Sequence, residues 1–298
     1  MTEKEAVLLL ENGLRELRTE GEKQKQLLLF TLSELSSLWL EEVKSSLVTD
    51  GDVRLPFPMF TREEDETLPD DYAAVMRESG EDERSSALSA LAVFLAKGLR
   101  ERDAAFSPWR ETAPKGGRVA YLPSARAEAA YAACAKARSD VSVAPVDNAL
   151  LGCAALAAED ADYLLLPYAT ASGARLSSTE RLVEEYDLYT VGMVQTGEEG
   201  GRYGLFSLHN APFVEKEQAY LSLRFTAGSY PHMGRMLSAF AVFGFAVKEL
   251  SFAEDYGRLS CRAVLGEKGD ALALWLYLCL YASGFSFLGR FPLLEAES

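Results

Sequence analysis

The stretch from Ala161 to Val194, ADYLLLPYATASGARLSSTERLVEEYDLYTVGMV, constrains the fold more than any other part of the chain. It opens with Tyr163–Leu166, a continuous apolar run that is typical of a strand covered on both faces. A proline ends the run, and the small residues of Ala169–Gly173 allow backbone amides to approach a ligand. The next residues predict a helix capped by Ser177 or Ser178, followed by a strand that returns to the sheet.

The residues before this stretch repeat the same alternation of strand and helix. Short apolar runs at Arg118–Leu122 and Val141–Pro145 predict strands, and the segments Ala125–Ala137 and Asn148–Ala158 predict helices. With Tyr163–Leu166 the order is βαβαβ, so we expect a small parallel sheet with right-handed crossovers. Ser124 is better placed to cap the first of these helices than to act as a catalytic hydroxyl.

The C-terminal part is the most regular region of the chain. Its predicted helices are Met233–Phe243 and Ala271–Ser283, and its predicted strands are Ala219–Phe225, Ala246–Phe252, Arg258–Leu265 and a short Ser286–Leu288. The order βαββαβ is that of ferredoxin-like domains. Between the two sheet regions, the glycines of Gln195–Gly201 predict a hairpin.

The N-terminal third is predicted to be helical. Leucines recur at spacings of three and four in a long first helix, and Leu88, Leu91, Leu95 and Leu99 form a similar stripe within Ser85–Glu101. A linker rich in proline, glycine and charge then separates this region from the first strand.

Composition excludes several classes of function. The net charge of −15 argues against binding to nucleic acid or to an anionic membrane, and no apolar run is long enough to span a bilayer. The acidic N-terminus is unlike a signal peptide, so we expect a cytoplasmic protein. The cysteines are too far apart for a zinc site and are expected to be buried free thiols. No glycine-rich phosphate loop is present either, so we expect no metal and no cofactor.

The residues of Ala161–Val194 resemble the prephenate dehydratase family, whose segment reads roughly ADY-x-VVPIENS-x-x-G and ends in a strand IVGE. The scaffold positions match, but Ala169 and Thr170 replace the acid and amide of PIENS. The family then continues through a second lobe to a Thr-Arg-Phe motif. Here the short segment Gln195–Gly201 leads directly to Arg202, and Gly201 replaces the threonine. The resemblance implies that Thr170 and Arg202 are remnants of a dehydratase site. We expect dehydratase activity to be lost, because the reaction needs a general acid in a desolvated cleft between two lobes.

The helices ahead of this segment resemble those of the bifunctional chorismate mutase–prephenate dehydratases of phenylalanine synthesis. The family's Arg and Lys further along its first helix correspond here to Leu32 and Val43. A mutase must hold a dianion and stabilise negative charge on the rearranging ether oxygen. The residues that the resemblance assigns to such a pocket are Arg15, Lys44, Arg62 and Glu63. The alternative is that the basic residues of the first helix form a solvated surface.

The C-terminal region resembles an ACT domain, and Leu288–Pro292 is similar to the LGxYP that closes this domain in the dehydratases. ACT domains of that family bind phenylalanine at a dimer interface, through a Gly-Ala-Leu turn and an ESRP strand. Arg235 stands where the turn has a small residue. The ligand-binding residues that the resemblance implies are Gly234, Leu237, Glu249 and Ser251.

The expected fold is therefore α+β and multi-domain. Residues 1–110 would form a helical chorismate mutase-like module, 117–210 a truncated dehydratase-like α/β lobe with a parallel sheet, and 216–294 a ferredoxin-like βαββαβ ACT domain. Two functions follow from the resemblance. The first is an enzyme whose remaining activity is the rearrangement of chorismate to prephenate. The second is a non-catalytic protein that binds an aromatic amino acid or a partner protein. In either case the ligand is a small molecule: chorismate, prephenate or an aromatic amino acid.

We also expect a homodimer, for a reason that lies in the last helix and strand. They contain more large apolar side chains than one ferredoxin-like domain usually buries, and an exposed patch of that kind marks an interface. The residues concerned are Trp275, Leu276, Tyr277, Leu280, Tyr281, Phe285, Phe287 and Phe291.

Overall fold

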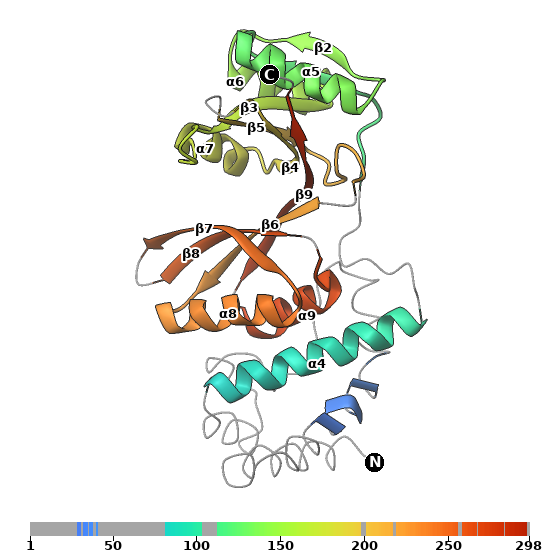
Figure 1. The fold of residues 1–298 in the computed structure, drawn as a ribbon, viewed down its shortest axis with the longest axis vertical. Coiled ribbons are helices and arrows are strands. Elements are labelled where there is room, and N and C mark those ends of the chain that lie inside the picture. The colour runs from blue at the N-terminus through green and yellow to red at the C-terminus, as the bar shows by residue number, and fades with distance from the viewer. Residues whose placement is uncertain are drawn as a thin grey trace.

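The structure is a computed structural model that describes residues 29–30, 32–34, 36–37, 40, 81–102, 112–197, 201–216, 219–255, 258–266, 268–282 and 284–296. Two lobes are stacked along its longest axis, and helix α4 lies beyond the second lobe (Figure 1). The four residues assigned to a mutase pocket, Arg15, Lys44, Arg62 and Glu63, lie outside the described residues.

The α/β lobe, residues 112–216, is built on parallel strands β1 (Arg118–Tyr121), β2 (Ser142–Pro145) and β3 (Tyr163–Ala169). Helices α5 (Ala125–Ala137) and α6 (Ala149–Ala157) connect them, which confirms the predicted βαβαβ order. As predicted, the Ser124 side chain caps α5, accepting a hydrogen bond from the backbone N–H of Ala127 at 3.2 Å.

The rest of this lobe follows the organising stretch of the sequence. Helix α7 (Ser177–Glu185) leads to strand β4 (Tyr189–Gln195), which pairs antiparallel with β5 (Arg202–Ser207) as the predicted hairpin. The predicted serine cap of α7 is wrong. The helix already includes Ser177, and its N-cap is Leu176, whose side chain makes no capping bond.

The C-terminal lobe, residues 219–296, has the predicted βαββαβ order. Its elements are β6 (Ala219–Ala227), α8 (Tyr230–Val242), β7 (Ala246–Asp255), β8 (Arg258–Gly266), α9 (Ala271–Tyr281) and β9 (Phe285–Glu295). Every second residue of β6 and β8 is buried in a core shared with α8 and α9. The residues between them therefore face the α/β lobe, because successive side chains of a strand point to opposite faces.

Strand β9 is much longer than the short strand that was predicted, and it joins the two lobes. Its first part pairs antiparallel with β6, and Leu293–Glu295 pair in parallel with β4. The nine strands of the described residues consequently form one sheet, in the order β2-β1-β3-β5-β4-β9-β6-β8-β7. Gly289, with a φ of 132°, lies against the backbone of Thr190, and a Cβ at this position would overlap the Thr190 carbonyl oxygen.

Helix α4 (Glu81–Arg102) packs on α8 and α9, on the side away from the sheet. Its leucine stripe shares a core with α9, and the Ser85 and Tyr277 hydroxyls are 2.8 Å apart between the two helices. The expectation of an exposed patch on α9 is therefore wrong: Trp275 is 7% exposed and Tyr277 is fully buried. The reason is that α4 covers, within the same chain, the side of α9 that the sheet leaves open.

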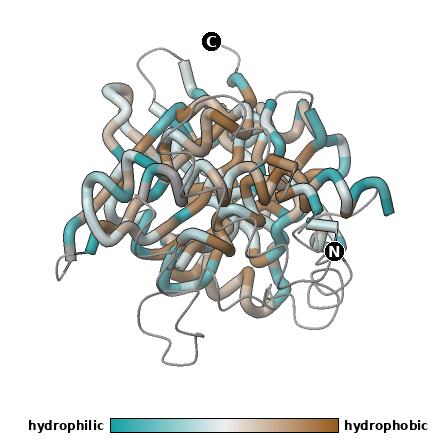
Figure 2. The backbone as a smooth tube through the Cα atoms, turned by 90° about the horizontal axis from the view of Figure 1, so that it is seen from below, coloured by the Kyte–Doolittle hydropathy of each residue, from teal (hydrophilic) through white to brown (hydrophobic). Residues whose placement is uncertain are grey.

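The described segments show the hydropathy pattern of a folded interior. Hydrophobic segments gather toward the middle of the molecule, and hydrophilic ones lie at its edge (Figure 2). Leu32, at a position where the mutase family has a basic residue, is 1% exposed in the apolar core beneath α4. Among the described helices, none is both long and apolar enough to cross a membrane.

Candidate functional site

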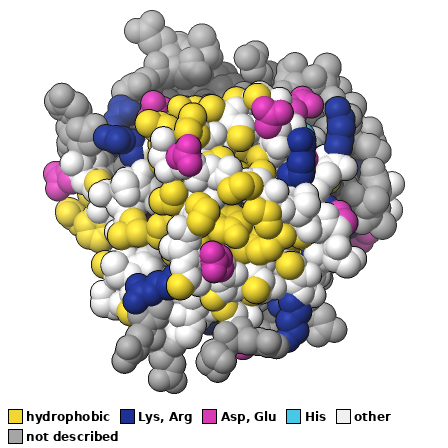
Figure 3. Space-filling view, turned by 90° about the horizontal axis from the view of Figure 1, so that it is seen from above, with side chains coloured by type: hydrophobic (Ala, Val, Ile, Leu, Met, Phe, Trp, Pro, Cys, Tyr) yellow, Lys and Arg dark blue, Asp and Glu magenta, His cyan; other side chains and the backbone are white. Residues whose placement is uncertain are grey.

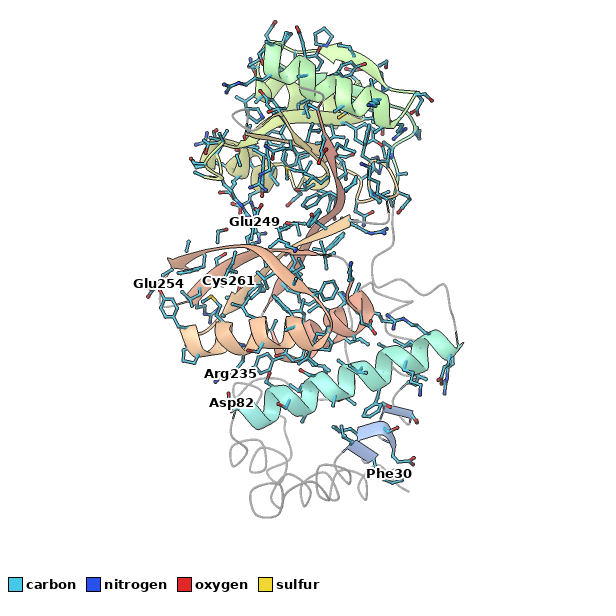
Figure 4. The ribbon with its side chains drawn as sticks, viewed as in Figure 1. Phe30, Asp82, Arg235, Glu249, Glu254 and Cys261 are labelled. Carbon is cyan, nitrogen blue, oxygen red and sulfur yellow. The ribbon has the colours of Figure 1, made fainter. Side chains whose placement is uncertain are left out.

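Charged side chains meet in the cleft between the two lobes. They come from α7, its preceding turn and β5 on one side, and from β6, β7 and β8 of the C-terminal sheet on the other. Figure 4 shows Glu249 on the face of that sheet that looks toward the α/β lobe, whereas Arg235 and Asp82 lie on the opposite side, toward α4.

Glu249 connects the lobes by pairing with two arginines. One carboxylate oxygen accepts from Arg175 at 3.1 Å, and the other accepts from Arg202. Arg175 also donates to the Ser251 hydroxyl at 3.2 Å. The structure thus brings Arg202, assigned by resemblance to a dehydratase remnant, against Glu249, and places Ser251 beside them.

Arg175 is held in an environment that stabilises its charge. Its side chain is 10% exposed, and its guanidinium lies 5.6 Å from the centre of the Tyr168 ring. Burial alone would lower the pKa of Arg175, but Tyr168 and Glu249 raise it above the ordinary value. Burial raises the pKa of Tyr168, so this phenol stays neutral beside the cation.

A second ion-pair network lies next to the first, under α7. Arg262 on β8 donates to Glu180 at 3.0 Å and to Glu184 at 3.2 Å. Arg224 on β6 donates to the same oxygen of Glu184 at 3.1 Å. Arg175 is within 3.4 Å of Glu180, so it links the two networks.

Among the described residues, pockets lie on both sides of this charged cluster. The first, called the aromatic pocket here, has a volume of about 250 Å³ and contains the stacked rings of Tyr220 and Phe291, with centroids 5.8 Å apart. Its polar side carries Arg202, Lys248 and Glu249. Its remaining lining residues are Met193, Gln195, Val264 and Leu293.

The second, called the arginine pocket, has a volume of about 320 Å³ and lies between α7 and the strands β6, β7 and β8. Its lining residues are Ser177, Glu180, Arg181, Glu184, Arg224, Ser251, Phe252, Ala253, Ser260 and Arg262.

The cleft has a charge opposite to that of the whole chain. Taken with Arg175, the two pockets contain six cationic side chains against three carboxylates, in a chain whose net charge is −15. Fields focused in a low-dielectric cleft raise the local concentration of counter-ions, so this arrangement favours an anionic or zwitterionic ligand.

Thr170 does not contribute to either pocket. It is exposed at the end of β3, where its hydroxyl lies 2.9 Å from that of Ser172 and accepts from the backbone N–H of Ala174. Gly201 has a φ of 75°, and a Cβ there would overlap the carbonyl oxygen of Ala169. The backbone at the motif position therefore requires glycine instead of the threonine of the family.

Within one chain, the four expected ligand contacts lie on two sides of the C-terminal sheet. Gly234 and Leu237 lie on α8, behind the sheet, whereas Glu249 and Ser251 point into the cleft in front of it. Arg235 points away from the sheet, and donates to the Tyr281 hydroxyl at 3.1 Å.

Sequence reasoning did not identify Arg175, Arg224, Arg262 or Lys248. A signal was present for Arg224 and Arg262, because each lies within a predicted strand and has an apolar residue on either side. A charge at such a position indicates a second covering layer with acidic partners.

The described residues contain no cluster of three or more histidine, cysteine or acidic side chains that could hold a metal ion. The cysteines are free thiols. Cys134, Cys153 and Cys261 are buried, as predicted, whereas Cys279 is half-buried. Burial raises the pKa of Cys134 to about 12, so its thiol stays protonated and unreactive.

No family model matches the chain, and a search of curated proteins finds no match. A prephenate dehydratase from Streptococcus mutans is 14% identical with a TM-score of 0.48, over 60% of this chain and 99% of that one. GqqA, described as a novel type of quorum quenching acylase, is 18% identical with a TM-score of 0.48, over 59% and 94%. A prephenate dehydratase from Arthrobacter aurescens, in complex with L-Phe, is 11% identical with a TM-score of 0.44, over 58% and 89%. With scores below 0.5, function has to be inferred from the chain's own residues.

Proposed function

We propose that this chain binds a free aromatic amino acid in the aromatic pocket and does not catalyse prephenate dehydration. The observation that carries this proposal is the composition of the pocket. One side offers the stacked rings of Tyr220 and Phe291, and the other offers cations and a carboxylate within the same cavity of about 250 Å³. Pockets with an apolar wall and a few convergent polar groups are typical of small-molecule sites.

The charges in this pocket complement an amino-acid zwitterion. Lys248 has no ion-pair partner among the described residues and is free to bind a ligand carboxylate, whereas Arg202 already pairs with Glu249. Glu249 is the acidic residue of the pocket, and a ligand ammonium would share its carboxylate with Arg175 and Arg202. An aromatic ring would lie against Tyr220 and Phe291, in an offset or edge-to-face arrangement.

A local irregularity in β7 supports this arrangement. Adjacent residues of a regular strand point to opposite faces, yet Lys248 and Glu249 both line the aromatic pocket. The pairing of β7 with β8 shifts register between Val247 and Glu249, at Lys248. Bulges of this kind re-aim a side chain and are common beside binding sites.

Titration calorimetry on the full chain tests the proposal with ligands that each lack one group. We expect L-phenylalanine to bind, and both 3-phenylpropanoate, which has no ammonium, and phenethylamine, which has no carboxylate, to bind about tenfold more weakly. Lys248→Gln should weaken phenylalanine binding but leave the affinity for phenethylamine unchanged. Arg126→Gln, which removes an exposed cation of α5 outside both pockets, is the matched control.

The proposal is wrong if phenylalanine, tyrosine and tryptophan all fail to give saturable binding, or if the truncated analogues bind as well as phenylalanine. Mutase activity stays a prediction, because its four assigned residues lie outside the described part of the chain. The buried Leu32 weighs against it, since that position would have to supply a cation to the substrate. An assay of chorismate turnover by the purified chain tests the mutase prediction.

A further inference from the structure

The arginine pocket contains a like-charge pair that the fold holds in place. Arg224 on β6 and Arg262 on β8 are directly opposite each other in the antiparallel pairing, and both side chains face α7. Like charges in this position destabilise a sheet unless something compensates them. In the structure, both guanidiniums donate to one oxygen of Glu184, and Arg262 also donates to Glu180.

The pocket has more cationic donors than its acidic residues can satisfy. Arg262 is 8% exposed and donates to Glu180 and Glu184, and Arg181 on α7 has no ion-pair partner among the described residues. A guanidinium presents more N–H donors than these contacts use, and its planar fork matches carboxylate and phosphate oxygens.

The charge of the pocket indicates the charge that a ligand there would need. The arginine pocket contains three arginines against the carboxylates of Glu180 and Glu184, and Arg175, which also pairs with Glu180, is a fourth cation beside it. A ligand with two negative charges would balance this excess of two. The hydroxyls of Ser177 and Ser260 on the pocket wall provide further hydrogen bonds to its oxygens.

We propose that the arginine pocket is a second ligand site, which binds a small dianion between Arg181, Arg224 and Arg262. The shared chemistry is two negative charges spread over several oxygens, within the span of a pocket of about 320 Å³, as in a phosphate monoester or a short dicarboxylate. This site is separate from the aromatic pocket and does not depend on what binds there.

Calorimetric titration of the full chain with inorganic phosphate, malonate and acetate, at constant ionic strength, tests the proposal. We expect saturable binding of phosphate or malonate in the millimolar range or tighter, and none of acetate. Arg181→Gln and Arg224→Gln should each weaken the dianion about tenfold, whereas Arg126→Gln should not. Because the exposed Arg181 has no ion-pair partner among the described residues, Arg181→Gln should leave the unfolding midpoint of the unliganded chain unchanged.

Tighter phosphate binding identifies a phosphate ester as the natural ligand class, and tighter malonate binding identifies a dicarboxylate. Both results support the site. The proposal is overturned if neither dianion saturates, if acetate binds equally well, or if Arg181→Gln and Arg126→Gln have the same effect.

Discussion

At the scale of single residues, the arrangement of the cleft depends on a few carboxylates that each accept hydrogen bonds from two arginines. Glu249 pairs with Arg175 and Arg202, whose side chains are 10% and 23% exposed. Removing one partner of such a pair leaves a charge that is poorly solvated and uncompensated, and this costs more than the pair itself contributes. The arginines are thereby fixed in place before any ligand arrives, which reduces the entropic cost of binding.

Gly201 gives a prediction at the same scale. Gly201→Ala should destabilise the chain by about 2 kcal/mol or more, because a non-glycine residue at positive φ is strained and because its Cβ would overlap a carbonyl oxygen. Gly173→Ala is the matched control: Gly173 has a φ of 84°, but open space surrounds the added Cβ. Urea unfolding measures both variants. Equal losses of stability would show that the steric overlap at Gly201 is relieved without cost.

Some residues of the cleft could be predicted from the sequence, but their arrangement could not. Glu249 and Ser251 were expected to bind a ligand and Arg202 to be a catalytic remnant, and the three lie together. Their proximity could not be predicted, because it depends on which face of the C-terminal sheet turns toward the α/β lobe. Period-two alternation predicts that a strand has two faces, but it does not predict which element covers each face.

At the scale of elements, the interface between α4 and α9 shows the same limit. The leucine stripe of α4 was predicted from its spacing, but its partner was not. Helix α9 is apolar on all sides, and this pattern is typical of a helix buried between two layers. It was interpreted as a dimer surface because the sequence does not reveal that a helix 170 residues earlier reaches it.

An ion pair between Arg100 and Asp270 also holds this interface together. Arg100 donates to both carboxylate oxygens of Asp270, one of them at 2.7 Å, and Asp270 also caps α9 by accepting from the backbone N–H of Ala273 at 2.9 Å. Burial alone would raise the pKa of Asp270, but Arg100 and the amides of α9 lower it below the ordinary value. Since the folded-state pKa is depressed, the stabilisation is present above the unfolded-state pKa of about 3.9 and is lost as pH falls through the folded-state pKa.

Arg100→Gln should therefore cost roughly 1 kcal/mol of unfolding free energy at neutral pH, and the difference from the parent should shrink in acid. Urea unfolding followed by tryptophan fluorescence measures it, since Trp275 is buried in α9. Lys97→Gln is the control, because its ion pair with Glu101 spans 3.9 Å between side chains that are 73% and 66% exposed. If Arg100→Gln lowers the unfolding free energy by the same amount at neutral and at acid pH, the charge of Asp270 has no role.

At the scale of the whole molecule, one continuous sheet connects two lobes of different architecture and ends in two strand edges, β2 and β7. Both ends carry exposed apolar side chains. Leu122, Val143, Leu150 and Leu151 lie on the α/β lobe, and the view from that end shows hydrophobic side chains gathered across its face (Figure 3). At the other end, β7 and α8 expose Tyr230, Val242, Val247, Leu250 and Phe252.

The β7 end is the better candidate for the expected homodimer. Strand β7 spans ten residues and is unpaired on its outer side among the described strands, whereas β2 has four residues and ends in a proline. An exposed edge strand presents unpaired backbone groups and is a template for adding another strand. Two copies related by a twofold axis could pair β7 with β7 and cover the rings of Tyr230 and Phe252, which are 5.8 Å apart.

We therefore expect the chain to sediment as a dimer at micromolar concentration, and Phe252→Lys to convert it to a monomer. Phe252 is 50% exposed, so the substitution should change the unfolding free energy of the monomer by less than about 0.5 kcal/mol. Leu150→Lys is the matched control, since Leu150 is 57% exposed on α6 at the opposite end of the sheet. If Leu150→Lys dissociates the dimer and Phe252→Lys does not, the interface lies on the α/β lobe. A parent chain that is already monomeric at this concentration would exclude both surfaces, and each ligand pocket would then have to be complete within a single chain.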